Sequence, residues 1–96
     1  MLEHVVVFKM KSDATDQQAD ELVRRLRGLK DAIPEIVALS AGRHIEARPD
    51  GFTIGIVVRF RDEAGLEAYR PHPEHQKVVA YINEVCADRI AVDYWI

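Results

Sequence analysis

The chain has 96 residues, of which 48% are hydrophobic and 30% are charged, and its net charge is −3. This composition is typical of an ordinary soluble globular protein, argues against disorder, and predicts a single domain over residues 1–96. A negative charge with dispersed basic residues gives no reason to expect a nucleic acid or an anionic membrane as a partner. The local cluster Arg24, Arg25 and Arg27 is interpreted as the solvated face of a helix.

Cys86 is the only cysteine, so no disulfide can form within the chain. Between Val85 and Ala87 on the last predicted helix, it is expected to be a small core residue and not a reactive thiol. The first apolar run, Val5 to Phe8, is far too short for a membrane span, and no signal peptide is recognisable. We therefore expect a cytoplasmic location and no membrane partner.

The first part of the chain is predicted to form a strand, a helix and a second strand. Residues Leu2–Lys11 are rich in β-branched and aromatic side chains, which favours a strand. Thr15 and Gln18 have the spacing of a capping box, and Pro34 ends the helix that follows. The apolar stripe of this helix consists of Ala19, Leu22, Val23, Leu26, Leu29 and Ile33.

The rest of the chain repeats this alternation of strands and helices. A second strand is expected over Ile36–Ala47, with Gly42 as a bulge or bend, and residues 48–51 form a tight turn before a third strand, Phe52–Arg61. Asp62 caps a short helix that runs through Tyr69. Pro73 begins the last helix, and Ile90–Ile96 is the last strand. The order β-α-β-β-α-β predicts an α+β, ferredoxin-like protomer with a four-stranded antiparallel sheet.

Both faces of the first and last strands are apolar, which indicates that both faces of the sheet are covered. The helices of this fold cover only one face, so a second copy of the chain, packed sheet on sheet, is the simplest cover for the other. We expect a homodimer; the alternative is a monomer with a partly exposed apolar sheet. The residues expected to face the partner are Val5, Val7, Val92 and Tyr94.

The segment from Tyr69 to His75 carries the strongest chemical signal. Two prolines fix its backbone, and it holds one phenol and two imidazoles within seven residues. Histidine and tyrosine together can transfer protons near neutral pH, so Tyr69 and His75 are the predicted acid–base pair. His75 falls in the first turn of the last helix and is expected to point inward, whereas His72, before Pro73, is expected outside the helix.

Polar residues also interrupt the apolar strands. His4 shares a strand face with Val6 and Phe8, and Asp93 lies on the last strand, which is the antiparallel neighbour of the first in this fold. Asp93 is therefore expected near His4, where it would orient the imidazole ring. Together these four residues, with Val6 and Phe8, are predicted to line a pocket between the helices and the sheet. A satisfied core contact without a functional role is the alternative.

Other kinds of site find less support in the sequence. His72 and His75 are three residues apart, as metal ligands can be, but no cysteine or acidic third ligand is evident. No glycine-rich phosphate loop, GxSxG elbow or CxxC pair occurs. We expect neither a metal nor a cofactor.

These residues resemble the stress-responsive α/β-barrel, or Dabb, domain family over nearly the whole chain. The most specific part is the Tyr-x-x-His-Pro-x-His pattern from Tyr69 to His75. Supporting matches are His4–Lys9, Ile33–Pro34, Gly42, Phe60 and Val92–Tyr94. The resemblance implies a ferredoxin-like protomer that pairs into a dimeric α+β barrel.

The family includes a plant polyketide cyclase that closes a ring by intramolecular aldol condensation without a cofactor. By resemblance, Tyr69 and His75 would be its acid–base pair, with His4 and Asp93 in the same pocket. Large aromatic residues on the first helix and late in the last helix deepen the cyclase-type pocket. Here Cys86 stands at the late-helix position, and the first helix carries aliphatic residues, so a narrower or differently shaped pocket is expected.

Three functions are therefore carried forward. The first is a cofactor-free small-molecule enzyme or binding protein that uses Tyr69 and His75. The second is a non-catalytic, stress-associated protective protein, which predicts a filled core around His75. The third, by analogy of fold alone, is a cofactor-free monooxygenase.

Overall fold

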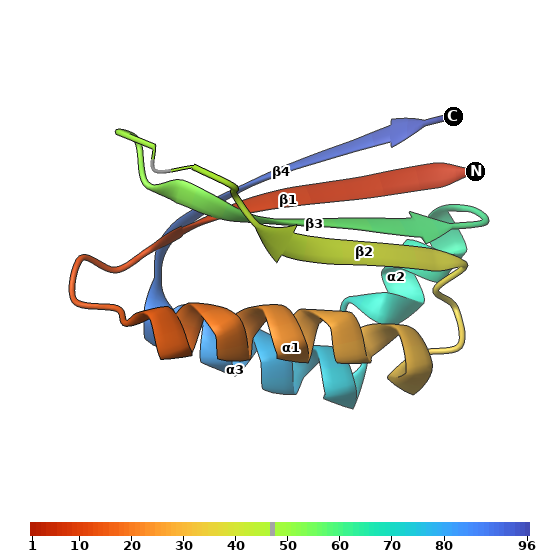
Figure 1. Ribbon diagram of the computed structural model, residues 1–96. Helices are drawn as coiled ribbons and strands as arrows, with labels where there is room; N and C mark the ends of the chain where they lie inside the picture. Colours follow the sequence, from red (N-terminus) through yellow and green to blue (C-terminus); the bar gives the residue numbers. More distant parts are fainter. Residues whose placement is uncertain (47) are drawn as a thin grey trace.

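In the computed structural model, which describes residues 1–46 and 48–96, three helices lie against one face of a four-stranded antiparallel sheet (Figure 1). The strand order is β2-β3-β1-β4, as predicted for a ferredoxin-like protomer. In chain order the elements are β1 (Leu2–Met10), α1 (Asp16–Ala32), β2 (Ala38–Arg43), β3 (Phe52–Phe60), α2 (Glu63–Tyr69), α3 (Pro73–Val85) and β4 (Cys86–Trp95).

Capping side chains fix where the helices begin. Thr15 accepts a hydrogen bond from the backbone N–H of Gln18, whose side chain accepts one from the backbone N–H of Thr15, so the predicted capping box is present. Asp62 caps α2 by accepting from the N–H of Gly65, at 3.0 Å. Pro73 opens α3, and His72 is its N-cap, as the pattern of the two prolines predicts.

The helix-facing side of the sheet, here called the inner face, holds the core. Along β3 every second residue from Ile54 to Phe60 is buried, as expected for a strand with one face in the core. These side chains meet the apolar stripe of α1, in which Leu22, Leu26 and Leu29 are almost fully buried. The core continues from α1 and β3 to β1 and α3, where Phe8 and Ile82 are also buried.

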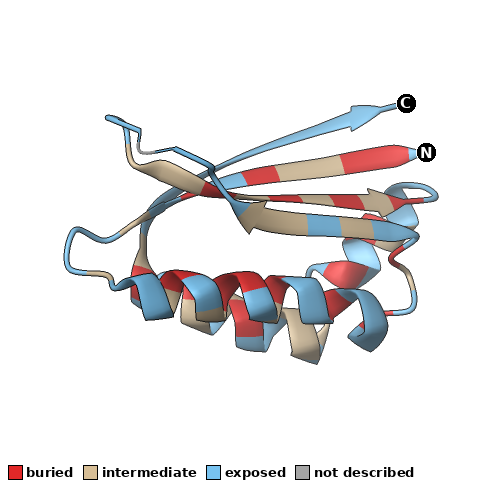
Figure 2. Ribbon diagram, viewed as in Figure 1, coloured by how far each residue is buried: buried red, intermediate tan, exposed pale blue. Residues whose placement is uncertain are grey.

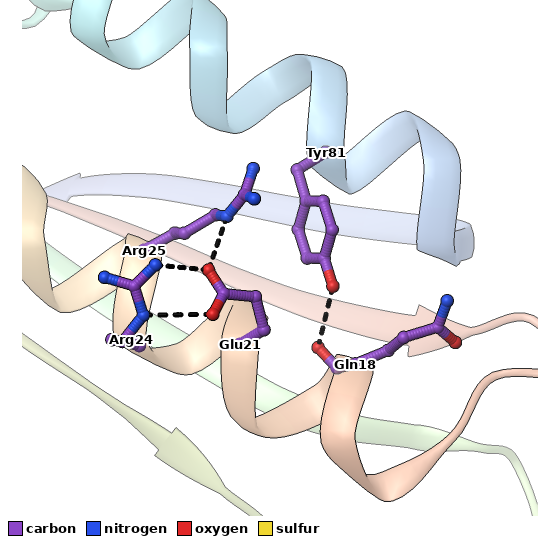
Figure 3. Close-up of polar contacts among 5 residues, drawn as sticks. All are labelled: Gln18, Glu21, Arg24, Arg25 and Tyr81. Atoms are coloured by element: carbon purple, nitrogen blue, oxygen red, sulfur yellow. Dashed lines mark hydrogen bonds and ion pairs between the residues drawn. The ribbon is translucent and has the colours of Figure 1, made fainter.

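Contacts between α1 and α3 hold the two long helices side by side (Figure 3). The guanidinium of Arg25 lies 4.0 Å from the centre of the Tyr81 ring, and the Tyr81 hydroxyl donates to the backbone carbonyl of Gln18 at 3.5 Å. Glu21 accepts from both Arg24 and Arg25. The predicted solvated face thus applies to Arg24, whereas Arg25 belongs to the helix–helix contact.

β4 is the part of the sheet that the helices leave uncovered. Every residue of this strand after Cys86 is exposed, whereas its neighbour β1 has four buried residues, Leu2, Glu3, Val6 and Phe8 (Figure 2). In Figure 1 β4 also rises away from the helices toward its C-terminal end. The inner face of β4 is consequently open beside α3.

Four sequence expectations require correction. β1 ends at Met10 and not at Lys11. β2 spans only Ala38–Arg43, so the expected second strand, Ile36–Ala47, was too long; its last expected residue, Ala47, lies outside the described residues. Gly42 is no bulge, since it pairs in register with Gly55. The last strand begins at Cys86 and not at Ile90, because α3 ends directly in extended backbone at Cys86. Cys86 is therefore the first residue of a strand and not a helical residue.

Alanine substitutions at two glycines should change the free energy of unfolding in opposite directions. Gly51 has φ +75°, and an added Cβ would come within 3.3 Å of the Lys9 side chain, so Gly51→Ala is expected to lower the free energy of unfolding by about 1–2 kcal/mol. Gly28 lies in α1 with no atom within 4 Å of an added Cβ, so Gly28→Ala is expected to raise it by about 0.5–1 kcal/mol. Urea unfolding of the two variants checks this; the same sign for both would contradict the assignment.

Candidate functional site

A cavity of about 400 Å³ lies between α3 and the inner face of β1 and β4. It exists because α3 packs against α1 and leaves the inner face of β4 open. Most of its surface is apolar, and its polar side chains gather from the α2–α3 junction and the two strands. The lining residues are His4, Val6, Phe8, Leu26, Ile56, Tyr69, Arg70, His75, Val78, Val79, Ile82, Arg89 and Ala91.

Tyr69 ends α2 and reaches the cavity from a buried position. Its ring is 3% exposed and packs on Phe60, with ring centres 5.1 Å apart, and on His75, with ring centres 4.0 Å apart. Burial raises the pKa of the Tyr69 hydroxyl to about 12. The hydroxyl therefore remains a protonated hydrogen-bond donor across the neutral range.

His75 is held in one tautomer by the backbone at the end of α2. Its Nδ1 lies 2.9 Å from the carbonyl oxygen of Arg70, and because a carbonyl can only accept, Nδ1 carries the proton. Nε2 is then the unprotonated nitrogen. Gln76 donates to the same carbonyl oxygen from its side chain.

The surroundings of His75 also keep its ring neutral. Burial lowers the pKa of His75 and is the main cause. The Arg70 carbonyl opposes this, and the Arg89 guanidinium lowers the pKa further, as do the imidazoles of His4 and His72 when they carry a proton. A pKa below the ordinary histidine value leaves the ring uncharged at pH 7. His75 thus pairs a neutral, oriented imidazole with the protonated Tyr69 hydroxyl.

His4 is connected to Asp93 and, through it, to Arg70. The antiparallel register places His4 opposite Asp93, and Nδ1 of His4 bonds directly to a carboxylate oxygen of Asp93. The other carboxylate oxygen lies 3.6 Å from the Arg70 guanidinium. The His4 ring is 6.1 Å from that of Tyr69, centre to centre, in an edge-to-face arrangement. Asp93 orients His4 without itself being among the cavity-lining residues.

The remaining residues singled out from the sequence divide into two groups. Val6 and Phe8 line the cavity floor beside His4. His72 accepts from the backbone N–H of Glu74 at 3.1 Å, which makes it a cap of α3. Cys86 lies 3.8 Å from the sulfur of Met10, and burial raises its pKa to about 11, so its thiol stays protonated.

The sequence reasoning missed Arg89 as a lining residue. Arg89 pairs with Phe8 in the register of β1 and β4 and therefore shares the inner face with it. Starting the last strand at Ile90 left Arg89 in a presumed loop. The sequence does carry a signal for it. Starting the strand one residue before Ile90 places Arg89 on the same face as Ala91 and Asp93, because alternate residues of a strand share a face.

Two further observations concern what the described residues do not form. Within 1–46 and 48–96, no group of three His, Cys, Asp or Glu side chains is arranged to hold a metal ion. Nor does any helix in these ranges have the length and apolar character needed to cross a membrane.

The fold and this cavity define a ferredoxin-like α+β protein with a polar-edged pocket between sheet and helix. The family model of the stress responsive A/B barrel domain, Dabb, matches residues 2–96, and the chain belongs to this family. The Arabidopsis thaliana stress-response A/B barrel domain-containing protein DABB1 is 32% identical over 98% of this chain. This chain spans 46% of the length of DABB1, and 36% of the length of a second stress-response A/B barrel domain-containing protein from the same plant.

Solved structures share the fold closely. A dimeric ferredoxin-like protein from Thermobifida fusca has a TM-score of 0.88 at 27% identity, over 99% of this chain and 90% of its own. A hydroxynitrile lyase from Passiflora edulis has a TM-score of 0.86 at 21% identity, over 99% of this chain and 92% of its own. At that identity the second likeness concerns the fold alone.

Proposed function

We propose that this chain forms a homodimer in which each protomer binds a small, mainly apolar molecule in the cavity and exchanges a proton with it through Tyr69 and His75. The observation that carries this proposal is a cavity of about 400 Å³ bordered by both of these side chains. Ligand sites in proteins are concave, mostly apolar and equipped with a few convergent polar groups, as this one is. A cavity beside His75 also favours this function over a non-catalytic protein, for which a filled core is expected.

The protonation states of the pair suit catalysis on a weakly acidic ligand. His75 Nε2 removes a proton from the ligand, for example from a carbon next to a carbonyl group, and the electron pair of that bond moves toward the carbonyl oxygen. The Tyr69 hydroxyl donates a hydrogen bond to the oxygen as it becomes negative. The proton on His75 then returns to the product. Such a step needs no cofactor and serves both ring closure by aldol condensation and carbon–carbon cleavage.

The hydroxynitrile lyase with the same fold supports this reaction class. Cleavage of a hydroxynitrile removes the proton of a hydroxyl group, breaks a carbon–carbon bond and delivers a proton to cyanide. One neutral base and one hydroxyl donor are sufficient for these transfers. We therefore propose that the protein is a lyase or a cyclase of this type. Polyketide cyclisation is one form of the proposed cyclase reaction.

The outer face of the sheet, which points away from the helices, supports the homodimer. Val7, Ile90, Val92 and Tyr94 share this face and are between 37% and 56% exposed. Apolar patches of this kind seldom remain open to water, and the similar protein from Thermobifida fusca is described as dimeric. One end of the face carries the ion pair between Glu3 and Arg59, which would lie at the rim of the contact.

Binding of a neutral two-ring amide, β-naphthamide, tests whether the cavity takes a ligand. Titration calorimetry of the intact chain should show saturable binding, with amide NMR shifts centred on His75 and Val79. Val79→Trp places an indole in the cavity and should lower the affinity at least about tenfold. Ala80→Trp is the matched control because Ala80 is the next residue on the exposed side of α3. Absent binding, or equal affinities for the two variants, would refute a ligand site in this cavity.

A further inference from the structure

The charges around the cavity are unbalanced. Its lining includes two guanidinium groups, two imidazoles and no carboxylate among the described residues. Arg70 is compensated by Asp93 at 3.6 Å. Arg89 has no such partner: the ion pairs of the described residues include none with its guanidinium. The Asp88 carboxylate next to it accepts from the backbone N–H of Arg89 and not from its side chain.

The backbone of Arg89 lies at the opposite end of the cavity from the acid–base pair. His4 and Phe8 are four residues apart on β1, which is about 13 Å along a strand. On α3 the lining runs from His75 to Ile82, which is about 10 Å along the helix axis. Because Arg89 pairs with Phe8, the cavity has Tyr69 and His75 near one end and the backbone of Arg89 near the other.

The floor between the two ends is apolar. Val6 and Ala91 pair across β1 and β4, and Val79 faces them from α3. A molecule that fills this space contacts carbon side chains along its body and meets polar groups only at its ends. The positive charge of Arg89 contributes to the lowered pKa of His75, which is consistent with a guanidinium that extends along the cavity toward His75.

From this arrangement we infer that Arg89 anchors a carboxylate group of the cavity ligand, which is therefore an apolar acid. This inference rests on the proposed function, since it names the class of molecule that the same cavity takes. A guanidinium can hold a carboxylate through two parallel hydrogen bonds, so it both orients such a ligand and selects it over a neutral one.

Two isosteric probes, β-naphthoate and β-naphthamide, separate the charge from the shape. Titration calorimetry at low salt should give roughly tenfold tighter binding of the carboxylate than of the amide. Arg89→Gln should abolish this preference and change the amide affinity by less than about twofold, whereas Arg89→Lys should retain part of the preference. Arg61→Gln, which removes an exposed arginine outside the cavity lining, should leave the preference intact. Added salt should weaken only the binding of the carboxylate.

The outcomes distinguish the role of Arg89 from the proposed function on which this inference rests. If the amide binds but the carboxylate binds no better, or if the preference survives Arg89→Gln, the role of Arg89 is refuted and the cavity remains a ligand site. If neither probe binds, both the ligand site and the role of Arg89 are refuted. Unchanged thermal unfolding of Arg89→Gln would show that a lost preference does not come from a misfolded variant.

Discussion

His75→Gln should slow the exchange of the methyl protons of methyl β-naphthyl ketone for deuterium by about 10²- to 10⁴-fold relative to the unaltered protein. This ketone has the shape of β-naphthamide and a weakly acidic methyl group beside its carbonyl. His75 Nε2 takes a methyl proton, Tyr69 donates to the enolate oxygen, and a deuteron from the solvent then replaces the proton. The measurement is the disappearance of the methyl signal by NMR in heavy water.

Tyr69→Phe tests the second member of the pair without changing the packing of the ring. It should also slow the exchange by at least about tenfold, because the enolate oxygen loses its donor, while β-naphthamide still binds. Tyr81→Phe is the matched control, since Tyr81 contacts α1. Exchange at the rate of buffer alone, or equal rates in all three variants, would contradict the acid–base assignment.

The pH dependence of this exchange follows from the two pKa shifts. His75 acts as a base only when neutral, and burial lowers its pKa, so the rate should rise through a midpoint below pH 6.5. Tyr69 acts as a donor until it ionises near its pKa of about 12, so the rate should remain level through the neutral range. The same depressed pKa means that His75 contributes stability above pH 6.5, which is lost as the pH falls through its folded-state value. His75→Gln should flatten both dependences.

Val92→Glu should convert a dimer of the 10.9 kDa chain into a monomer. Val92 is 56% exposed in the protomer and pairs with Val5 on the outer face of the sheet. Burying a carboxylate there in both protomers, with loss of the apolar contact, should weaken association by about 4–6 kcal/mol, or about 10³- to 10⁴-fold. Light scattering after gel filtration across a range of concentrations measures this change.

Ala80→Glu is the control for the added charge, because Ala80 is exposed on α3, away from the sheet. It should leave the mass of the dimer unchanged. Far-UV circular dichroism should show that the Val92→Glu monomer keeps its secondary structure, since the core between α1 and β3 lies on the other face. A dimer that survives Val92→Glu would place the contact on a different surface.

Local signals in the sequence were sufficient for most of the elements. The capping box at Thr15, the cap at Asp62 and the proline at residue 73 define helix starts through bonds to neighbouring residues. The alternation in β3 is unambiguous because one of its faces is buried in the core. The start of β4 was missed because α3 passes directly into the strand at Cys86, and no glycine or proline between Val85 and Ile90 marks the boundary.

For the candidate site, the sequence predicts the chemical groups and part of their arrangement. The spacing from Tyr69 to His75 keeps the phenol and the imidazole together, and the expected neighbourhood of β1 and β4 brings Asp93 to His4. The cavity beside them is set by the tertiary structure and not by local sequence, because it depends on α3 packing against α1 and away from β4. It also decided the place of Arg89, since the register that sets it opposite Phe8 is fixed by pairing between segments far apart in the chain. Local sequence patterns indicate which face of each segment is buried. The cavity between α3, β1 and β4 depends on how these elements pack together, which the pattern of no single segment describes.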